Sequence, residues 1–385
     1  MRKRTIMIVA GEPSGDIHGA CIIKSLKSLN PSLEFIGAGG KRMVEAGLKG
    51  IGGMENFAIV GFKEVCGKIR LLKRNFEKLS RMMRCEKPDC FIPIDYPGFN
   101  LRLAEVAKST GIPVFYYISP QVWAWGKNRI KKIQKYVDKM YVILPFEEEF
   151  YSRYGVKAEF VGHPLLDIVK PVLGREEALS YFHLDRDKPV IGLLPGSRWE
   201  EIRLSLPVMV DVCRIISCKI PEIQFSILVA ENIDARRVKS LLNREDSQIH
   251  LVKEKPYEFM NLCDLLLVNS GTATLEAAIL GRPMVIIYKL SFFSWILGKI
   301  LIRIPNFGLV NIIAGEEIVP EFLQFGARSS VIAKEILHML HNRNKRERIQ
   351  RNLYKVKEKL GKNGASQRAA KAILEELVVG GECLK

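Results

Sequence analysis

The chain reads LLLVNSGTATLEAAILGRP from Leu265 to Pro283, and this stretch decides the expected fold. The apolar run Leu265–Val268 is typical of a buried strand, and Thr272–Leu280 is typical of a helix that ends at Gly281. A strand, a turn of small residues and a helix place free backbone N–H groups and the positive end of the helix at one spot. The turn therefore predicts an anion-binding site.

The turn itself suggests a nucleotide as the anion. Ser270, Gly271 and Thr272 are expected to surround a phosphate. A carboxylate beside that phosphate would repel it, so Glu276 is expected one step away, where it accepts both hydroxyls of a ribose. The alternative is an ordinary Ser/Thr helix cap with a solvent-facing Glu, which the local sequence leaves equally open.

Strands and helices alternate along most of the chain, which predicts parallel sheets covered on both faces. The expected strands are Thr5–Ala10, Glu34–Gly37, Cys90–Ile94, Val114–Ile118, Met140–Leu144, Glu159–Val161, Val190–Leu194, Phe225–Val229, Ile249–Val252, Leu265–Val268 and Met284–Ile287. Helices are expected between them, among them Ile17–Leu29, Leu101–Ser109, Ile202–Ile216, Ala235–Leu242 and Thr272–Leu280. From about Ser329 onward the pattern is all-helical.

The fold class is therefore α/β, with two doubly wound, Rossmann-like domains facing a cleft and a helical C-terminus. We expect an N-terminal domain over residues 1–166 and a second domain over 167–345. Helices over 346–385 are expected to pack back on the first domain. The stretch Leu165–Pro189 is interpreted as a link. Ligands of such sheets bind at the carboxyl ends of the strands.

Composition limits the function classes. Hydrophobic residues make up 48% of the 385 residues, and the net charge of +17 favours an anionic partner: a phosphorylated substrate, a phospholipid surface or nucleic acid. The eight cysteines are scattered without a C-x-x-C motif, so neither a zinc site nor a disulfide framework is expected. The basic start of the chain is interpreted as leading into a first strand, and no run approaches the ~20 apolar residues of a membrane-spanning helix.

Unusual residues follow the first and third expected strands. The segment Gly11–Gly19 contains Glu12, Ser14 and Gly15, and its glycines suggest the close approach of a ligand. A structural turn capped by Asp16 is the alternative. Asp95 ends an apolar strand, where partial desolvation would make it a better base, and the alternative is a turn-forming Asp.

The second half has a similar loop, Gly196-Ser197-Arg198, between a strand and a helix. Gly196 permits a sharp turn, and Arg198 offers a fork of donors to a phosphate, unless it pairs with a neighbouring Glu. Trp123 and Trp125 follow another strand and suit a sugar face, an acyl chain or plain packing.

These motifs occur together in one order. They are GEPSGD at 11–16, FIPIDYPGFN at 91–100, SPQVWAW at 119–125, FVGHP at 160–164, PGSRWEEI at 195–202, SGTATLE at 270–276, VNIIAG at 310–315 and IVPEFLQ at 318–324. The chain resembles the bacterial lipid-A-disaccharide synthase family over essentially its whole length. The resemblance implies an inverting glycosyltransferase of the GT-B type, which joins UDP-2,3-diacylglucosamine and 2,3-diacylglucosamine 1-phosphate (lipid X) through a β-1′,6 linkage and releases UDP.

The resemblance also implies roles for single residues. Asp95 would be the general base on the acceptor 6-hydroxyl, and Arg198 would neutralise the departing diphosphate. Ser270–Thr272 would donate to phosphate, Glu276 would take the ribose, and Glu12 and Asn311 fall in matching motifs. His18 and His163 are interpreted as structural. Neither a metal nor a cofactor is expected.

Acylated substrates imply contact with a membrane surface. Phe62, Val65, Ile69, Leu72 and Phe76 recur at helical spacing among basic residues, which is typical either of a basic helix on an anionic membrane or of a core-facing helix. Leu290–Ile304 is a second candidate. The expected location is the cytoplasm, at the inner face of the inner membrane. No nucleic-acid partner is expected, and a homodimer is compatible with the architecture.

Two other functions also fit the sequence. A related glycosyltransferase that makes the peptidoglycan lipid-linked disaccharide would share the fold, but it should carry a G-x-G-G-H loop that Gly11–Gly19 lacks. The other rival is a basic nucleotide-binding protein without transferase activity.

Overall fold

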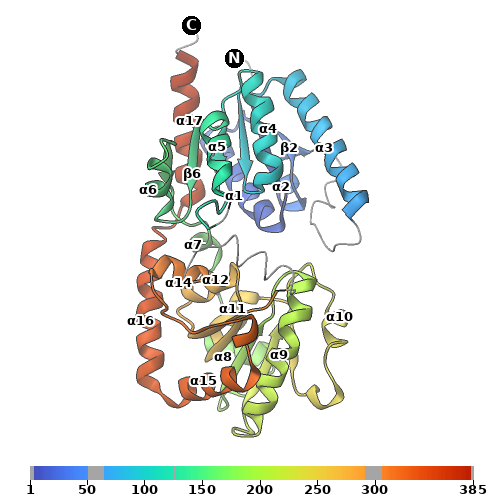
Figure 1. Ribbon diagram of the computed structural model, residues 1–385, viewed down its shortest axis with the longest axis vertical. Coiled ribbons are helices and arrows are strands. Elements are labelled where there is room, and N and C mark those ends of the chain that lie inside the picture. The colour runs from blue at the N-terminus through green and yellow to red at the C-terminus, as the bar shows by residue number, and fades with distance from the viewer. Residues whose placement is uncertain (1–3, 51–64, 125, 291–305, 383–385) are drawn as a thin grey trace. The chain divides into compact units, whose positions relative to one another are not determined.

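The computed structural model describes residues 4–50, 65–124, 126–290 and 306–382, whose helices and strands are drawn in Figure 1. The chain forms two compact units, which we call unit 1 (Met1–Pro164 with Leu360–Lys385) and unit 2 (Leu165–Lys359). Each unit is built around its own parallel sheet.

Unit 1 contains a seven-stranded parallel sheet in the order β3-β2-β1-β4-β5-β6-β7. The strands are β1 (Thr5–Ala10), β2 (Glu34–Ala38), β3 (Leu48–Gly50), β4 (Cys90–Ile94), β5 (Phe115–Tyr117), β6 (Lys139–Val142) and β7 (Ala158–Phe160). Chain order reverses between β1 and β4, the position at which doubly wound sheets bind ligands. Ala10 pairs with Ile94 there, so the loops after these two strands begin side by side.

Helices cover the sheet of unit 1, which is why its central strands are continuously apolar and buried. The helices are α1 (Pro13–Leu29), α2 (Lys41–Glu45), α3 (Val65–Glu86), α4 (Pro97–Ser109), α5 (Ile130–Tyr136), α6 (Glu147–Ser152) and α17 (Ala365–Glu382). One group packs α1 against α2 and α17, and another packs α4 against α3 and α5. Proline occupies the first turn of α1 and of α4. This position suits proline, because the N–H that it lacks would have no acceptor within the helix.

Unit 2 repeats this plan with a six-stranded parallel sheet in the order β10-β9-β8-β11-β12-β13. The strands are β8 (Val190–Leu194), β9 (Gln224–Leu228), β10 (His250–Val252), β11 (Leu265–Asn269), β12 (Met284–Tyr288) and β13 (Glu321–Leu323). Chain order reverses between β8 and β11. These two strands are fully buried, and the two loops that follow them carry the predicted anion-binding residues.

The helices of unit 2 are α7 (Leu165–Ile168), α8 (Arg175–Tyr181), α9 (Trp199–Ser217), α10 (Ala235–Lys239), α11 (Pro256–Leu262), α12 (Ala273–Ile279), α14 (Leu309–Ala314), α15 (Ser329–His341) and α16 (Arg343–Lys359). In one group α16 packs against α12, α14 and α15, and α15 packs against α9. Within the described ranges, no helix has both the length and the apolar character needed to span a bilayer.

The predicted doubly wound α/β fold is confirmed, and two local expectations are corrected. The stretch Leu165–Pro189 is not a plain link, because it contains α7 and α8, and α8 packs against α11. The short edge strands β3 and β13 were not expected, since three residues carry too little periodicity to indicate a strand.

The C-terminal helices divide between the two units. α16 belongs to unit 2, where Lys359 Nζ donates to the carbonyl oxygens of Ile313 and Ala314 at 3.1 Å each. α17 belongs to unit 1 and packs on α1, and Arg368 Nε donates to the Val161 carbonyl at 2.9 Å. The assignment of an acceptor role and a UDP-sugar role to the two domains stays a prediction.

Candidate active site

The predicted residues of unit 1 lie at the carboxyl ends of β1 and β4, where chain order reverses. Asp95 follows β4 directly and is half-buried. Asp95 and Tyr96 are consecutive residues in the left-handed region, with φ values of 43° and 50°. Such backbone costs roughly 1–3 kcal/mol per residue and persists only where its surroundings enforce it, as they often do at functional sites.

Two buried side chains enforce the backbone at Asp95. Tyr116 donates its hydroxyl to the Asp95 carbonyl oxygen at 2.6 Å, and Asn100 Nδ2 donates to the same oxygen at 2.8 Å. Asn100 Nδ2 also lies 3.1 Å from the Ile94 carbonyl oxygen. Burial, followed by the negative charge of Asp95, raises the pKa of Tyr116 well above its usual value, so Tyr116 stays a donor. Neither Asn100 nor Tyr116 was predicted as a site residue, although Asn100 belongs to the FIPIDYPGFN motif.

The glycines of the first loop serve packing. A side chain on Gly11 would collide with the ring of Tyr96, so this glycine lets the Asp95–Tyr96 turn approach the loop after β1. Gly15 lies in the first turns of α1, where a Cβ would be 3.2 Å from the Cβ of Ala10. These contacts explain both glycines by packing, and the close approach of a ligand to this loop stays a prediction.

The polar residues of this loop have separate roles. Glu12 is the N-cap residue of α1, and Ser14 in the first turn is exposed. After burial, the charge of Glu12 is the second cause that raises the pKa of Tyr96, which indicates that Glu12 lies near the Asp95–Tyr96 turn. Asp16 does not cap its own helix. Its carboxylate accepts from the N–H groups of Arg42 and Met43 at the start of α2.

A buried carboxylate that sequence analysis did not identify fixes the tryptophan loop. Glu147 is 1% exposed and accepts from Trp123 Nε1 at 3.2 Å and from the Leu144 N–H at 3.0 Å. Burial raises its pKa to about 7. Trp123 is therefore tied to the base of its loop. Trp125 lies outside the described residues.

His18 and His163 are both buried in unit 1. Burial lowers the pKa of His18 to about 4, and burial together with His18 lowers that of His163 to about 3. Both imidazoles are neutral at physiological pH, which agrees with a structural role.

The loop after β8 in unit 2 contains Gly196, Ser197 and Arg198. Gly196 has a φ of 120°, and a Cβ there would lie 2.7 Å from Oε2 of Glu201, so glycine is required. Asn232 Nδ2 donates to the Ser197 carbonyl at 3.0 Å and fixes the turn. Arg198 is the N-cap residue of α9, and its side chain is 64% exposed.

Arg198 Nη1 lies 3.3 Å from Oε1 of Glu201, so the alternative expected from sequence, pairing with a neighbouring Glu, is present. Exposed pairs of this kind contribute only ~0–1 kcal/mol. Exchange of this carboxylate for a phosphate would therefore cost little.

The loop after β11 leads into α12. Ser270 donates its N–H to the Ile287 carbonyl at 2.8 Å and its hydroxyl to the Phe307 carbonyl at 3.0 Å. The expected donation of Ser270 to a phosphate is therefore replaced by these internal bonds. Gly271 and Thr272 are exposed, and a Cβ on Gly271 would meet no atom within 4 Å. At the start of α12 the N–H groups of Thr274 and Leu275 donate to the carbonyls of Gly271 and Thr272, at 3.2 and 2.9 Å. The N–H of Ala273 precedes the first of these bonds.

Glu276 lies one helical turn beyond Thr272, to whose carbonyl its N–H donates at 3.2 Å. Tyr257 donates its hydroxyl to Glu276 Oε1 at 3.4 Å. Burial raises the pKa of Glu276 to about 7, so this carboxyl group is not the solvent-facing Glu of the alternative interpretation.

Asn311 is fully buried in α14 and is occupied within the protein. Its Nδ2 donates to the Val319 carbonyl and to Glu321 Oε1 at 2.8 and 2.6 Å, and its Oδ1 accepts from the N–H groups of Ile318 and Val319. Glu321 in turn accepts from the N–H groups of Phe307 and Gly308. Asn311 therefore holds the strand β13 to the segment that begins at Phe307, the partner of Ser270.

The candidate membrane helix is described only in part. Leu72 and Phe76 of α3 pack against the core of unit 1, and the Phe76 and Phe99 rings lie 5.9 Å apart. This end of the apolar stripe faces the core. Phe62 and the segment 291–304 lie outside the described residues. No group of three or more potential metal ligands occurs in the described part of the chain.

Solved structures with this architecture include a UDP complex and a glycosyltransferase. The UDP complex of S. aureus MnaA matches with a TM-score of 0.66 at 15% identity, over 98% of this chain and 97% of that chain. The calicheamicin glycosyltransferase CalG4 matches with a TM-score of 0.61 at 14% identity, over 98% and 99%. Two Rossmann-like sheets with polar loops at both reversal points thus define the GT-B class of fold, which glycosyltransferases and related epimerases share.

Sequence comparison narrows this class to one family. The model of the family described as lipid-A-disaccharide synthetase matches residues 6–376. The lipid-A-disaccharide synthase of Geobacter sulfurreducens is 44% identical over 372 residues, 97% of each chain. That of Coxiella burnetii is 41% identical over 373 residues, 97% of this chain and 98% of the relative. The chain belongs to the lipid-A-disaccharide synthetase family and is a glycosyltransferase of lipid A biosynthesis.

Proposed function

We propose that the protein transfers the sugar of UDP-2,3-diacylglucosamine to the 6-hydroxyl of 2,3-diacylglucosamine 1-phosphate (lipid X), with inversion to a β-1′,6 linkage and release of UDP. Family membership supports the reaction class. The observation that carries the site is the strained Asp95–Tyr96 turn, which Tyr116 and Asn100 hold in place.

In this proposal unit 1 binds the acceptor and Asp95 is the general base. Its backbone is fixed by two buried donors, which hold the point from which the side chain leaves the turn after β4. A carboxylate is a weak base, which suffices when proton transfer is late and the new bond has already acidified the hydroxyl. Glu12 and Ser14 lie in the adjoining loop and are proposed to contact the acceptor.

Unit 2 binds UDP in this proposal. Arg198 exchanges Glu201 for the diphosphate and neutralises the charge that develops on the leaving group. The N–H groups of Thr272 and Ala273, at the start of α12, donate to phosphate. Glu276 accepts from the ribose hydroxyls. These residues stabilise the leaving group without a metal ion. Asn311 and Ser270 position this loop rather than contact the ligand.

The test is a transfer assay with UDP-2,3-diacylglucosamine and lipid X, in which UDP and a tetraacyl disaccharide phosphate are measured. Asp95→Asn preserves shape and the backbone bonds of residue 95, so it should fold and bind UDP normally. It should lower kcat about 10²- to 10⁴-fold, the usual contribution of a general base. Glu45→Gln is the matched control, because Glu45 is an exposed carboxylate of the same unit.

Three outcomes would contradict the proposal. Turnover of folded Asp95→Asn near that of Glu45→Gln would remove Asp95 as the base. UDP binding without any disaccharide from the wild-type protein would favour a nucleotide-binding protein. Product formed only with a peptidoglycan lipid acceptor would favour the other glycosyltransferase.

A further inference from the structure

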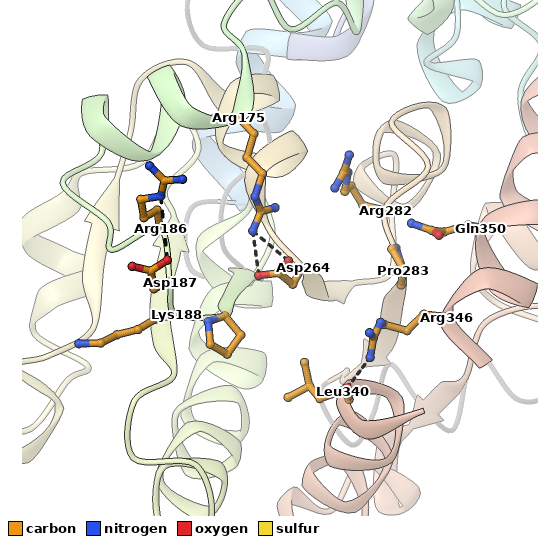
Figure 2. Close-up of a pocket in the computed structure, with 11 residues that line it drawn as sticks. Arg175, Arg186, Asp187, Lys188, Asp264, Arg282, Pro283, Leu340, Arg346 and Gln350 are labelled. Atoms are coloured by element: carbon orange, nitrogen blue, oxygen red, sulfur yellow. Dashed lines mark hydrogen bonds and ion pairs between the residues drawn. The ribbon is translucent and has the colours of Figure 1, made fainter. Parts of the chain in front are cut away.

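A charged pocket lies at the amino ends of the unit 2 strands, opposite the strand ends that carry the candidate UDP site. It has a volume of about 390 Å³ and lies at the amino ends of β8, β11 and β12 (Figure 2). Its lining combines five cationic side chains with two carboxylates. The charged lining residues are Arg175, Arg186, Lys188, Arg282, Arg346, Asp187 and Asp264.

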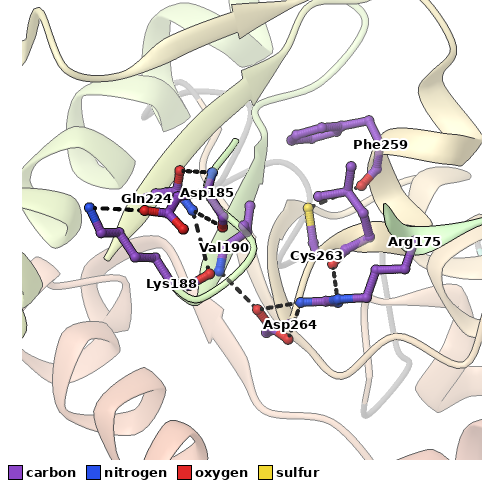
Figure 3. A network of polar contacts seen from close by, with 9 residues as sticks. Arg175, Asp185, Lys188, Val190, Gln224, Phe259, Cys263 and Asp264 are labelled. Carbon is purple, nitrogen blue, oxygen red and sulfur yellow. Dashed lines mark hydrogen bonds and ion pairs between the residues drawn. The ribbon is translucent and has the colours of Figure 1, made fainter. Parts of the chain in front are cut away.

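One wall of the pocket is a fixed polar network (Figure 3). Arg175 Nη2 donates to the two carboxylate oxygens of Asp264 at 2.9 and 3.2 Å, and Arg175 Nη1 donates to the Leu262 carbonyl. Asp264 also accepts from the N–H of Val190 at 2.9 Å. Asp264 is therefore engaged by Arg175 and by the start of β8, so its carboxylate oxygens are already used by these two donors.

Among the cations of the pocket, Arg282 gives the strongest indication of a bound anion. It follows α12, immediately before β12, and its Nε is buried without a hydrogen-bond partner in the described part of the chain. Burial, followed by the positive charge of Arg175, lowers the pKa of Arg282. A guanidinium group beside a second cation, with a buried N–H unpaired, is costly unless an anion compensates it.

Three further cations line the same pocket. Arg346 of α16 donates to the carbonyls of Met339 and Leu340 and thereby caps α15, yet retains its charge at the pocket (Figure 2). Arg186 and Lys188 stand at the rim and are 70% and 41% exposed. Both rim cations have carboxylate partners, because Arg186 lies 3.5 Å from Glu176 and Lys188 lies 3.2 Å from Asp185. Arg282 is therefore the cation on which the argument for a bound anion rests.

We infer that this pocket is a binding site for a phosphate-class oxyanion, distinct from the candidate UDP site. Its volume exceeds that of a single phosphate and suits a diphosphate or a phosphate ester. Arginine forks bind such oxyanions bidentately, and the ligand would supply the missing acceptor for Arg282 Nε. The anion is either a free phosphate compound or the headgroup of an anionic lipid, because both present the same oxygens.

The test measures the binding of inorganic diphosphate by calorimetry in an Arg198→Gln background, which weakens the candidate UDP site. Arg198→Gln should still bind diphosphate. Adding Arg282→Gln should weaken this binding roughly ten- to hundredfold, as expected for lost charge-assisted hydrogen bonds. Adding Arg244→Gln is the charge-matched control, since Arg244 is exposed and is not among the residues that line the pocket.

A second variant guards against misfolding of Arg282→Gln. Gln350 lines the pocket and is exposed, so Gln350→Glu should fold and should weaken diphosphate binding by repulsion. Vesicles of phosphatidylglycerol test whether the anion is a lipid headgroup. If the protein binds these vesicles but not diphosphate, Arg282→Gln should reduce vesicle binding, and Arg244→Gln should leave it unchanged. Equal binding by the Arg282→Gln, Gln350→Glu and Arg244→Gln proteins, or no binding of either probe, would overturn the inference.

Discussion

Carboxyl groups next to the two sheets differ in what surrounds them. Asp95 projects from a strained turn whose backbone is held by Tyr116 and Asn100. Glu276 is half-buried in a regular helix, with Tyr257 as its hydrogen-bond donor. Both residues were predicted from their motifs. Only the folded structure shows that Asp95 lies in a strained turn, whereas burial suppresses the ionisation of Glu276.

Burial of Glu276 predicts a pH-dependent affinity for UDP. Its pKa of about 7 means that the carboxyl group is protonated below this pH, and only the carboxylate accepts both ribose hydroxyls. UDP affinity should therefore rise as the pH increases through 7, by up to about tenfold per pH unit. Calorimetric titrations on both sides of pH 7 measure this rise.

Glu276→Gln is the control for this pH dependence, because its amide does not titrate while ionisation of the UDP phosphate is unchanged. The difference in pH profile between wild type and variant isolates Glu276. Identical profiles would show that Glu276 does not contact the ribose.

At the scale of elements, the central strands and most helices were predictable because their patterns are long and regular. β1, β4, β8 and β11 are apolar throughout, as strands covered on both faces must be. The short edge strand β13 was not predictable from its own three residues. Its place depends on pairing with β12 and on the clip that Asn311 and Glu321 form.

That clip predicts a structural role for Asn311. Asn311→Ala removes four hydrogen bonds from a fully buried site and leaves the N–H groups of Ile318 and Val319 without their acceptor. The free energy of unfolding, measured by urea denaturation, should fall by about 2–4 kcal/mol.

Asn344→Ala is the matched control, because Asn344 is exposed on α16, and it should change the free energy of unfolding by less than ~0.5 kcal/mol. If Asn311→Ala were as stable as this control but failed to bind UDP, Asn311 would be a ligand contact instead of a structural clip.

At the scale of the whole molecule, the excess of basic residues is the dominant property. A net charge of +17 favours anionic surfaces, and acylated substrates would bring the protein to a membrane. Leu72 and Phe76, two residues of the apolar stripe on α3, pack against the core of unit 1, whereas Lys73 and Arg74 on the same helix are exposed. Charge on α3 is thus available to a membrane surface.

We therefore predict binding to phosphatidylglycerol vesicles that weakens as salt is added, because salt screens exposed charges. The double variant Lys73→Glu with Arg74→Glu should reduce binding in a sedimentation assay. Lys371→Glu, at an exposed lysine of α17, is the control for a change of charge elsewhere. Absence of binding at every salt concentration would contradict a role at a membrane surface.

The sequence alone determined the two doubly wound sheets, the polar loops at their reversal points and the family, because periodicity and ordered motifs are local properties. Tertiary structure decided which of those polar residues remain available to a ligand. Ser270 and Asn311 are occupied internally by partners 37 and 8 residues away, and Gly11 admits the ring of Tyr96. It also gathered Arg175, Asp264, Arg282 and Arg346 into one pocket. Strand order and helix packing set such contacts between distant residues, and no local pattern encodes them.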